Sequence, residues 1–187
     1  VHGNVVAVVD EGQCGQGAFA WDGALVGTDA VVTAAKGVPL LLLVADCVPV
    51  LLFDPVHRVL ALAHAGWKGT VAGIAAASLQ VMKERFGTKG EECLAALGPS
   101  IGPCCYPVGE NVLQKLPANL PAGLLRSEKG EHRLDLRGFN AWLLSQAGIP
   151  LQRIADSGVC TCCQKDLFFS HRGDNGQSGR LGFLAWL

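Results

Sequence analysis

Short runs of apolar residues alternate with longer segments in the first third of the chain. These runs have the length and composition of β-strands and cover Val5–Val9, Ala30–Thr33, Leu40–Val44, Val48–Phe53 and Val59–Ala63. The last three runs are continuously apolar rather than alternating, which predicts strands that are covered on both faces.

The spacing of apolar residues then changes to every third or fourth position, which is typical of an amphipathic helix. This pattern predicts a helix over residues 69–86, ended by Gly87, and another over Leu136–Ala147, ended by Gly148. A shorter helix is predicted over Val108–Leu116.

Two further strands are predicted at Leu94–Leu97 and Arg180–Leu187. The polar, proline-containing segment Pro117–Gly130 is expected to form an exposed loop. Strands and helices mixed in one unit predict a single α/β (α+β) domain over residues 1–187.

Composition narrows the possible partners. Half of the 187 residues are apolar and 17% are charged, which excludes extended disorder. Fifteen basic and sixteen acidic residues leave no positive surface for nucleic acid or anionic membranes. The longest apolar stretch, Val38–Phe53, contains Asp46 and is too short to span a bilayer. We therefore expect neither a nucleic acid nor a membrane as a partner.

Three potential metal ligands stand at the ends of predicted strands: His2, Cys47 and His64. Two imidazoles and a thiolate suit zinc, and three protein ligands leave the fourth tetrahedral position open. The alternatives are a terminal histidine, a buried thiol and a strand-end histidine with a structural partner.

Five other cysteines occur as an adjacent pair, Cys104-Cys105, and as the group Cys160, Cys162 and Cys163. They are candidates for a second, structural zinc site. Because we read their spacing as different from the C-x-x-C pairs of zinc ribbons and fingers, buried reduced thiols are the favoured interpretation. Disulfides are not expected, because the chain has enough apolar residues for a core without them.

Two cations and an aromatic pair are candidates for ligand binding. Lys68 follows Gly66-Trp67 at the start of a predicted helix, where anions bind. Arg172 follows Phe168 and Phe169, which are able to stack on a flat base or to belong to a strand core. A solvated lysine at a loop-to-helix turn is the alternative for Lys68. Neither a phosphate-binding loop motif nor a hydrolase nucleophile motif occurs.

Taken together, several motifs in this order resemble the laccase-domain family. The motifs are Val1-His2-Gly3, Ala45-Asp46-Cys47-Val48-Pro49-Val50, His64-Ala65-Gly66-Trp67-Lys68-Gly69, Gly98-Pro99-Ser100-Ile101-Gly102-Pro103-Cys104-Cys105-Tyr106, and Cys160-Thr161-Cys162 with Phe168-Phe169-Ser170. Members of this family carry the older label polyphenol oxidase and are now described as purine nucleoside phosphorylases with adenosine deaminase activity.

The resemblance implies a layered α/β/β/α sandwich of mixed sheets flanked by helices, in a cytoplasmic protein. It implies zinc held by His2, Cys47 and His64, with copper as a possible alternative metal. The implied substrates are phosphate and the purine nucleosides adenosine, inosine, guanosine and methylthioadenosine. Family members also carry a segment before the Val-His-Gly motif, with a candidate phosphate-binding Ser-x-Arg-x-Gly-Gly motif. We expect this chain to lack that segment.

The resulting hypothesis is phosphorolysis, with phosphate attacking C1′ of the nucleoside. Cys47, His64 and Asp46 are the expected catalytic residues, with Asp46 orienting a ligand or carrying a proton. Lys68, Arg172 and Phe169 are expected to bind substrate. Asp46 capping the following turn is the alternative for that carboxylate.

Three rival functions have other requirements. A multicopper oxidase needs a second histidine cluster, and a thiol hydrolase would use Cys47 as nucleophile and His64 as base. A non-catalytic module would bind a nucleoside or a partner without turnover. The sequence is compatible with a monomer or a small homo-oligomer.

Overall fold

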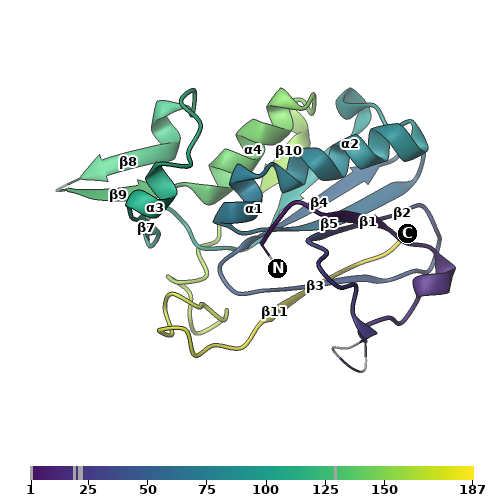
Figure 1. Ribbon diagram of the computed structural model, residues 1–187, viewed down its shortest axis with the longest axis horizontal. Helices are drawn as coiled ribbons and strands as arrows, with labels where there is room; N and C mark the ends of the chain where they lie inside the picture. The colour runs from purple at the N-terminus through teal and green to yellow at the C-terminus, as the bar shows by residue number, and fades with distance from the viewer. Residues whose placement is uncertain (1, 19, 21–22, 129) are drawn as a thin grey trace.

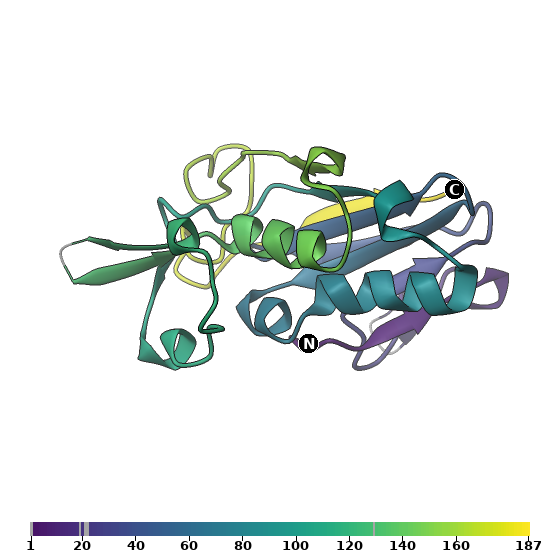
Figure 2. The ribbon, with the colours of Figure 1, turned by 90° about the horizontal axis from the view of Figure 1, so that it is seen from above.

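A computed structural model describes residues 2–18, 20, 23–128 and 130–187. It consists of a layer of helices, a six-stranded sheet and a two-stranded sheet (Figure 1). The expected mixed α/β class is confirmed. A small three-stranded sheet projects from one end of these layers (Figures 1 and 2).

The six-stranded sheet has the order β1-β2-β5-β4-β6-β10 and mixes parallel and antiparallel pairs. Its strands are β1 (Val6–Val8), β2 (Ala30–Thr33), β4 (Val48–Asp54), β5 (Val59–Ala65), β6 (Leu94–Leu97) and β10 (Ile154–Asp156). Five of these strands were predicted from apolar runs, and β10 was not.

The two central strands of this sheet pair antiparallel along their whole length, from Val48 opposite Ala65 to Asp54 opposite Val59. Most of their side chains are buried, including Val50, Leu52 and Ala63. Burial on both faces explains their continuous apolar sequences. It also fixes the backbone from which Cys47 and His64 project.

Helices cover one face of this sheet (Figure 2). They are α1 (Trp67–Val71), α2 (Ile74–Phe86) and α4 (Leu136–Gln146). The single helix predicted over residues 69–86 is therefore wrong in one respect, because Gly73 adopts a left-handed conformation (φ +78°) that separates α1 from α2. Gly87 ends α2 in the same conformation, as predicted.

The other face of the sheet is covered by β3 (Leu40–Val44) and β11 (Leu181–Ala185), which pair antiparallel. Leu40 packs between the sheets, whereas Leu41 is 55% exposed and Leu43 is 40% exposed. The prediction that β3 is covered on both faces is thus wrong, because β3 belongs to an outer layer.

The projecting sheet contains β7 (Pro107–Val108), β8 (Leu125–Glu128) and β9 (Glu131–Leu134) in the order β7-β9-β8. Two predictions are wrong here. The expected loop Pro117–Gly130 contains strand β8, and the helix expected over Val108–Leu116 is reduced to α3 (Glu110–Leu113). Strand β8 was missed because its hairpin with β9 is largely exposed and its residues are mostly polar, so the sequence shows no apolar run there.

Short 3-10 helices complete the described structure, at Glu11–Gln13, Gly90–Glu92, Ala122–Leu124 and Leu151–Arg153. Within the described residues, every helix falls short of the length and apolar character needed to cross a bilayer.

Candidate functional site

His2, Cys47 and His64 lie together, with their potential ligand atoms all within 4.8 Å of one another. Cys47 Sγ is 4.0 Å from His2 Nε2, and the two imidazole rings meet edge to face with their centroids 4.9 Å apart. Tetrahedral zinc with one sulfur and one nitrogen ligand would place those two atoms roughly 3.6 Å apart. The three side chains thus form a compact group, which we call the trio.

The sheet brings the trio together from three separate segments. His2 precedes β1, Cys47 immediately precedes β4, and His64 is the penultimate residue of β5. Because Val48 pairs with Ala65, the start of β4 and the end of β5 lie at the same edge of the sheet. The prediction that strand ends bring these residues together agrees with the observed placement.

Asp29 is a neighbour of the trio that the sequence analysis missed. It is 3% exposed, and one of its carboxylate oxygens accepts a hydrogen bond from the Gly3 N–H at 2.9 Å. Its other oxygen faces His64 Nδ1 at 3.8 Å. The Asp29 carbonyl also accepts the His64 backbone N–H at 2.8 Å. A carboxylate behind a ligand histidine holds the ring in position and tunes its basicity.

Gly66 leaves the space that the trio occupies. A Cβ atom at this position would lie 2.8 Å from His2 Cδ2 and 2.9 Å from Cys47 Sγ. Both distances are shorter than van der Waals contact, so any larger residue would displace a trio side chain. Glycine at this turn is therefore required by the close approach of the trio.

Burial sets the protonation states of Cys47 and His2. Burial, reinforced by the negative charge of Asp46, raises the pKa of Cys47 to about 11. Partial burial lowers the pKa of His2, which favours the neutral imidazole that binds metals. The Cys47 thiol is thus protonated near neutral pH unless a cation compensates its charge. This donor set of two imidazoles and one sulfur fits zinc.

Asp46 supports the loop that approaches the trio. Its Oδ1 accepts a hydrogen bond from the Thr161 hydroxyl at 2.6 Å, and its Oδ2 accepts the Arg172 backbone N–H at 2.6 Å. Its backbone is left-handed (φ +77°), a conformation that aspartate tolerates better than most residues. Both carboxylate oxygens are engaged with the loop, and this arrangement favours positioning over proton transfer.

The predicted substrate-binding residues are exposed. Lys68 lies in α1, with its Nζ 5.7 Å from the Trp67 ring centroid, and its positive charge acts on His2. The guanidinium of Arg172 lies over the Tyr106 ring at 5.5 Å.

Phe169 is 50% exposed and lies outside any strand, so it does not belong to a strand core. Its ring lies against Gly179, where a Cβ atom would come within 2.8 Å. The residue after Gly179, Arg180, is a cation that the sequence analysis did not select. Its positive charge offsets part of the rise that burial causes in the pKa of Cys47. An arginine just before a strand was the only signal in the sequence.

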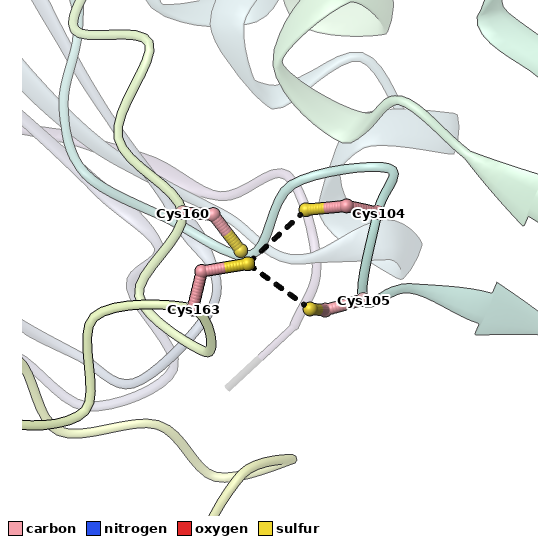
Figure 3. A group of neighbouring side chains, drawn as sticks. All are labelled: Cys104, Cys105, Cys160 and Cys163. Atoms are coloured by element: carbon pink, nitrogen blue, oxygen red, sulfur yellow. Dashed lines mark hydrogen bonds between the residues drawn. The ribbon is translucent and has the colours of Figure 1, made fainter.

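A second group of cysteines lies outside the trio. Cys104, Cys105, Cys160 and Cys163 bring their sulfurs within 4.8 Å of one another (Figure 3), and all eight cysteines are free thiols. The interpretation as buried thiols is wrong for Cys104 and Cys163, which are exposed. The spacing was also misread, because Cys160 and Cys163 form a C-x-x-C pair once Cys162 is left out.

Histidines do not form a second cluster in the part of the chain that the structure describes. His57 contacts Asp54 at 2.8 Å and His132 contacts the Ser127 hydroxyl at 2.8 Å. The metal-ligand groups found among the described residues are the trio and the four cysteines. The histidine-rich copper cluster of a multicopper oxidase is therefore absent from the described residues.

A hollow of about 780 Å³ lies away from the trio. Its lining is mostly apolar and comes from β4, β6, β10 and the C-terminal segment, including Trp186. Because it contains none of the trio residues, its size does not make it the reaction site.

Comparisons with known proteins identify the family of the chain. The family described as "Multi-copper polyphenol oxidoreductase laccase" matches residues 1–187. The "Purine nucleoside phosphorylase YlmD" of Bacillus subtilis (strain 168) is 37% identical over 183 residues, which are 96% of this chain and 66% of that protein. The chain therefore spans slightly less than two thirds of that relative.

Two further matches extend the comparison. "Adenosine deaminase RL5", from an unknown prokaryotic organism, is 38% identical over 183 residues, covering 96% of this chain and 70% of that protein. The crystal structure of the Bacillus licheniformis hypothetical protein YfiH superposes with a TM-score of 0.96 at 41% identity, covering all of this chain and 72% of that one. The chain belongs to the laccase-domain family of multi-copper polyphenol oxidoreductase laccases.

Proposed function

We propose that the protein is a zinc-dependent purine nucleoside phosphorylase with adenosine deaminase side activity. The observation that carries this proposal is the convergence of His2, Cys47 and His64 beside buried Asp29. The names of the relatives support the reaction class, since one is a purine nucleoside phosphorylase and another an adenosine deaminase. The proposed nucleosides are adenosine, inosine, guanosine and methylthioadenosine.

His2, Cys47 and His64 would hold the metal, and Asp29 would orient His64. A zinc ion held there would supply Lewis acidity to the substrate. The chain's own residues complete the site. Gly66 leaves room for the trio, and Asp46 fixes the loop that carries Arg172.

In phosphorolysis a phosphate oxygen forms a bond to C1′ while the bond from C1′ to the purine nitrogen breaks. The purine leaves with the electron pair of that bond and takes up a proton. Phosphate brings negative charge, which we propose that the exposed cations Lys68, Arg172 and Arg180 neutralise. Phe169 offers an exposed ring on which a purine would stack.

Two rival functions have less support from the geometry. A thiol hydrolase would need an ionised Cys47, but burial raises the pKa of that thiol to about 11. A polyphenol oxidase would need the second histidine cluster that the described residues lack. Copper bound at the trio would not by itself supply that chemistry.

The decisive test is a chromatographic assay of the zinc-loaded protein with adenosine, run with and without phosphate. We expect free adenine and ribose 1-phosphate only when phosphate is present. Inosine formed independently of phosphate would support the deaminase activity alone. No product from any of the four nucleosides, in a protein that retains zinc at the trio, would contradict the proposal.

Cellular setting and assembly stay predictions. We propose a cytoplasmic protein that acts on small molecules, as a monomer or small homo-oligomer. Size-exclusion chromatography with light scattering measures the oligomeric state directly, and a high-order assembly would contradict this part of the proposal.

A further inference from the structure

Four cysteines converge outside the trio, from two loops that are far apart in the sequence. Cys104 and Cys105 follow β6, and Cys160 and Cys163 follow β10. Cys163 Sγ lies 3.5 Å from Cys104 Sγ and 3.4 Å from Cys105 Sγ (Figure 3). The four sulfurs point toward one another, and we call this group the four-cysteine cluster.

The spacing of the sulfurs matches a tetrahedral metal site. Four sulfurs bound to one zinc at 2.3 Å are separated by roughly 3.8 Å. The observed separations, from 3.4 Å up to a limit of 4.8 Å, lie on either side of that value. A metal ion would therefore enter with only small side-chain movements.

Simple burial of thiols does not explain the cluster. Cys104 and Cys163 are exposed, and Cys105 is only partly buried. Two disulfides could in principle pair the four sulfurs, but Cys163 Sγ lies almost equally far from Cys104 Sγ (3.5 Å) and Cys105 Sγ (3.4 Å), so the geometry selects no disulfide partner. A shared cation accounts for all four.

A backbone donor and a positive charge lie next to the cluster. The Gly102 N–H donates a hydrogen bond to Cys160 Sγ at 3.2 Å. A Cβ atom on Gly102 would lie 3.2 Å from both Cys104 Sγ and the Cys160 Cβ, so glycine permits this close approach. The Arg133 side chain donates to the Cys104 carbonyl, which brings a positive charge to the rim of the cluster. Backbone donors and nearby positive charge stabilise thiolates around a metal.

Both loops are fixed independently of any metal. Ser100 forms a bridge with Cys160, and the Thr161 N–H donates to the Ser100 carbonyl at 3.1 Å. The buried Arg137 donates to the carbonyls of Ser100 (3.1 Å) and Val159 (2.7 Å). These contacts hold the two loops in place before an ion binds, so binding an ion costs less conformational entropy.

We propose that Cys104, Cys105, Cys160 and Cys163 bind a structural zinc ion, separate from the metal of the trio. Four protein ligands leave no open position, so this site is closed to substrate. It would lock the loop after β10, whose Thr161 and Arg172 bind Asp46 beside Cys47. The four-cysteine cluster therefore supports the trio without taking part in its chemistry.

The test is a zinc count by native mass spectrometry after loading under reducing conditions and removing loose metal. We expect two zinc ions per chain in the wild type and one in the double variant Cys104→Ser/Cys163→Ser. The control Cys14→Ser, at an exposed cysteine outside both groups, should keep two. An unchanged count in a folded double variant would overturn the proposal.

A second measurement on the wild type avoids any dependence on the folding of a variant. Thiol alkylation mapped by peptide mass spectrometry should show Cys104, Cys105 and Cys163 protected by zinc and reactive again after a chelator is added, whereas Cys160 is buried in either case. Equal alkylation with and without zinc would overturn the proposal. So would a disulfide between Cys163 and either Cys104 or Cys105 that forms despite zinc. Neither readout depends on enzymatic activity.

Discussion

The trio and the four-cysteine cluster differ in the backbone that carries them. The trio stands at the edge of a buried sheet, where β4 and β5 pair along their whole length. The four-cysteine cluster stands on two loops that are tied together by Ser100 and Arg137. Three mixed ligands on a rigid edge would leave a position for substrate, whereas four sulfurs on joined loops would close around a metal ion.

The same residue type, cysteine, has different neighbours in the two regions. Cys47 is a single sulfur among imidazoles, and its neighbour Asp46 reaches across to Thr161, the residue after Cys160. One carboxylate thus connects the two regions. Variants in each region, and at this connection, separate their roles.

The largest effect is expected for Cys47→Ala. Removing the only sulfur of the trio should abolish metal retention there and lower adenosine turnover by more than about 100-fold. Metal analysis and the chromatographic assay measure both quantities, with Cys14→Ala as the matched control. Full turnover by Cys47→Ala with no metal bound would refute the role of the trio.

Gly66→Ala tests the shape of the same site without removing a ligand. The added Cβ would meet His2 and Cys47 at less than 3 Å, so zinc affinity at the trio should fall about 10- to 100-fold. A competition titration with a chromophoric chelator measures this change. Gly123→Ala is the control, because a Cβ there meets nothing within 4 Å. Equal affinity in both variants would show that Gly66 has no part in shaping the site.

Asp46→Asn tests the connection between the two regions. The amide lacks the negative charge that strengthens both hydrogen bonds, and the Thr161 hydroxyl must turn to accept from its NH2 group, at a cost of about 1–3 kcal/mol in the free energy of unfolding. Urea denaturation measures this cost, with the exposed Asp166→Asn as control. We also expect slower turnover while both zinc ions are retained. If stability and turnover match the wild type, Asp46 does not hold the loop.

Asp54→Asn changes a carboxylate at the far end of β4, roughly 20 Å along the strand from Cys47. Burial tends to raise the pKa of Asp54, but the Thr88 hydroxyl and donors from His57 and Val56 outweigh it, so its pKa lies below the ordinary 3.8. Its contribution is complete above pH 3.8 and is lost as the pH falls toward the lowered value.

The variant should therefore lose about 1–2 kcal/mol of unfolding free energy at neutral pH, and less below pH 3.8. Denaturation curves at neutral pH and below pH 3.8 measure this difference. At neutral pH the zinc content of the variant should equal that of the wild type. A loss of zinc from either region would show that metal binding reports general stability rather than local geometry.

Much of this arrangement was predictable from the sequence. Apolar runs located five strands of the central sheet because β2, β4 and β5 are largely buried and because β1 and β6 contain apolar residues alone, and strand ends identified the trio. The exposed strands β8 and β9 were missed because their polar residues show no alternation. The break between α1 and α2 depends on the left-handed backbone of Gly73. The spacing of apolar residues continues across this glycine and therefore did not predict the break.

The parts of the site that were missed depend on contacts between distant segments. Asp29 precedes a buried strand and meets His64 only after the strands pair. The four-cysteine cluster joins residues 55 or more positions apart, and its C-x-x-C pair was hidden by the intervening Cys162. Such convergence is a property of the assembled fold rather than of any local pattern.

The most direct test of the division between the two regions is a zinc titration of the metal-free protein that follows thermal stability and adenosine turnover together. We predict that the first equivalent raises the melting temperature without turnover, because four sulfurs outcompete the trio. The second equivalent should then bring turnover with little further stabilisation. Turnover that is complete after the first equivalent, or that never depends on zinc, would contradict this account.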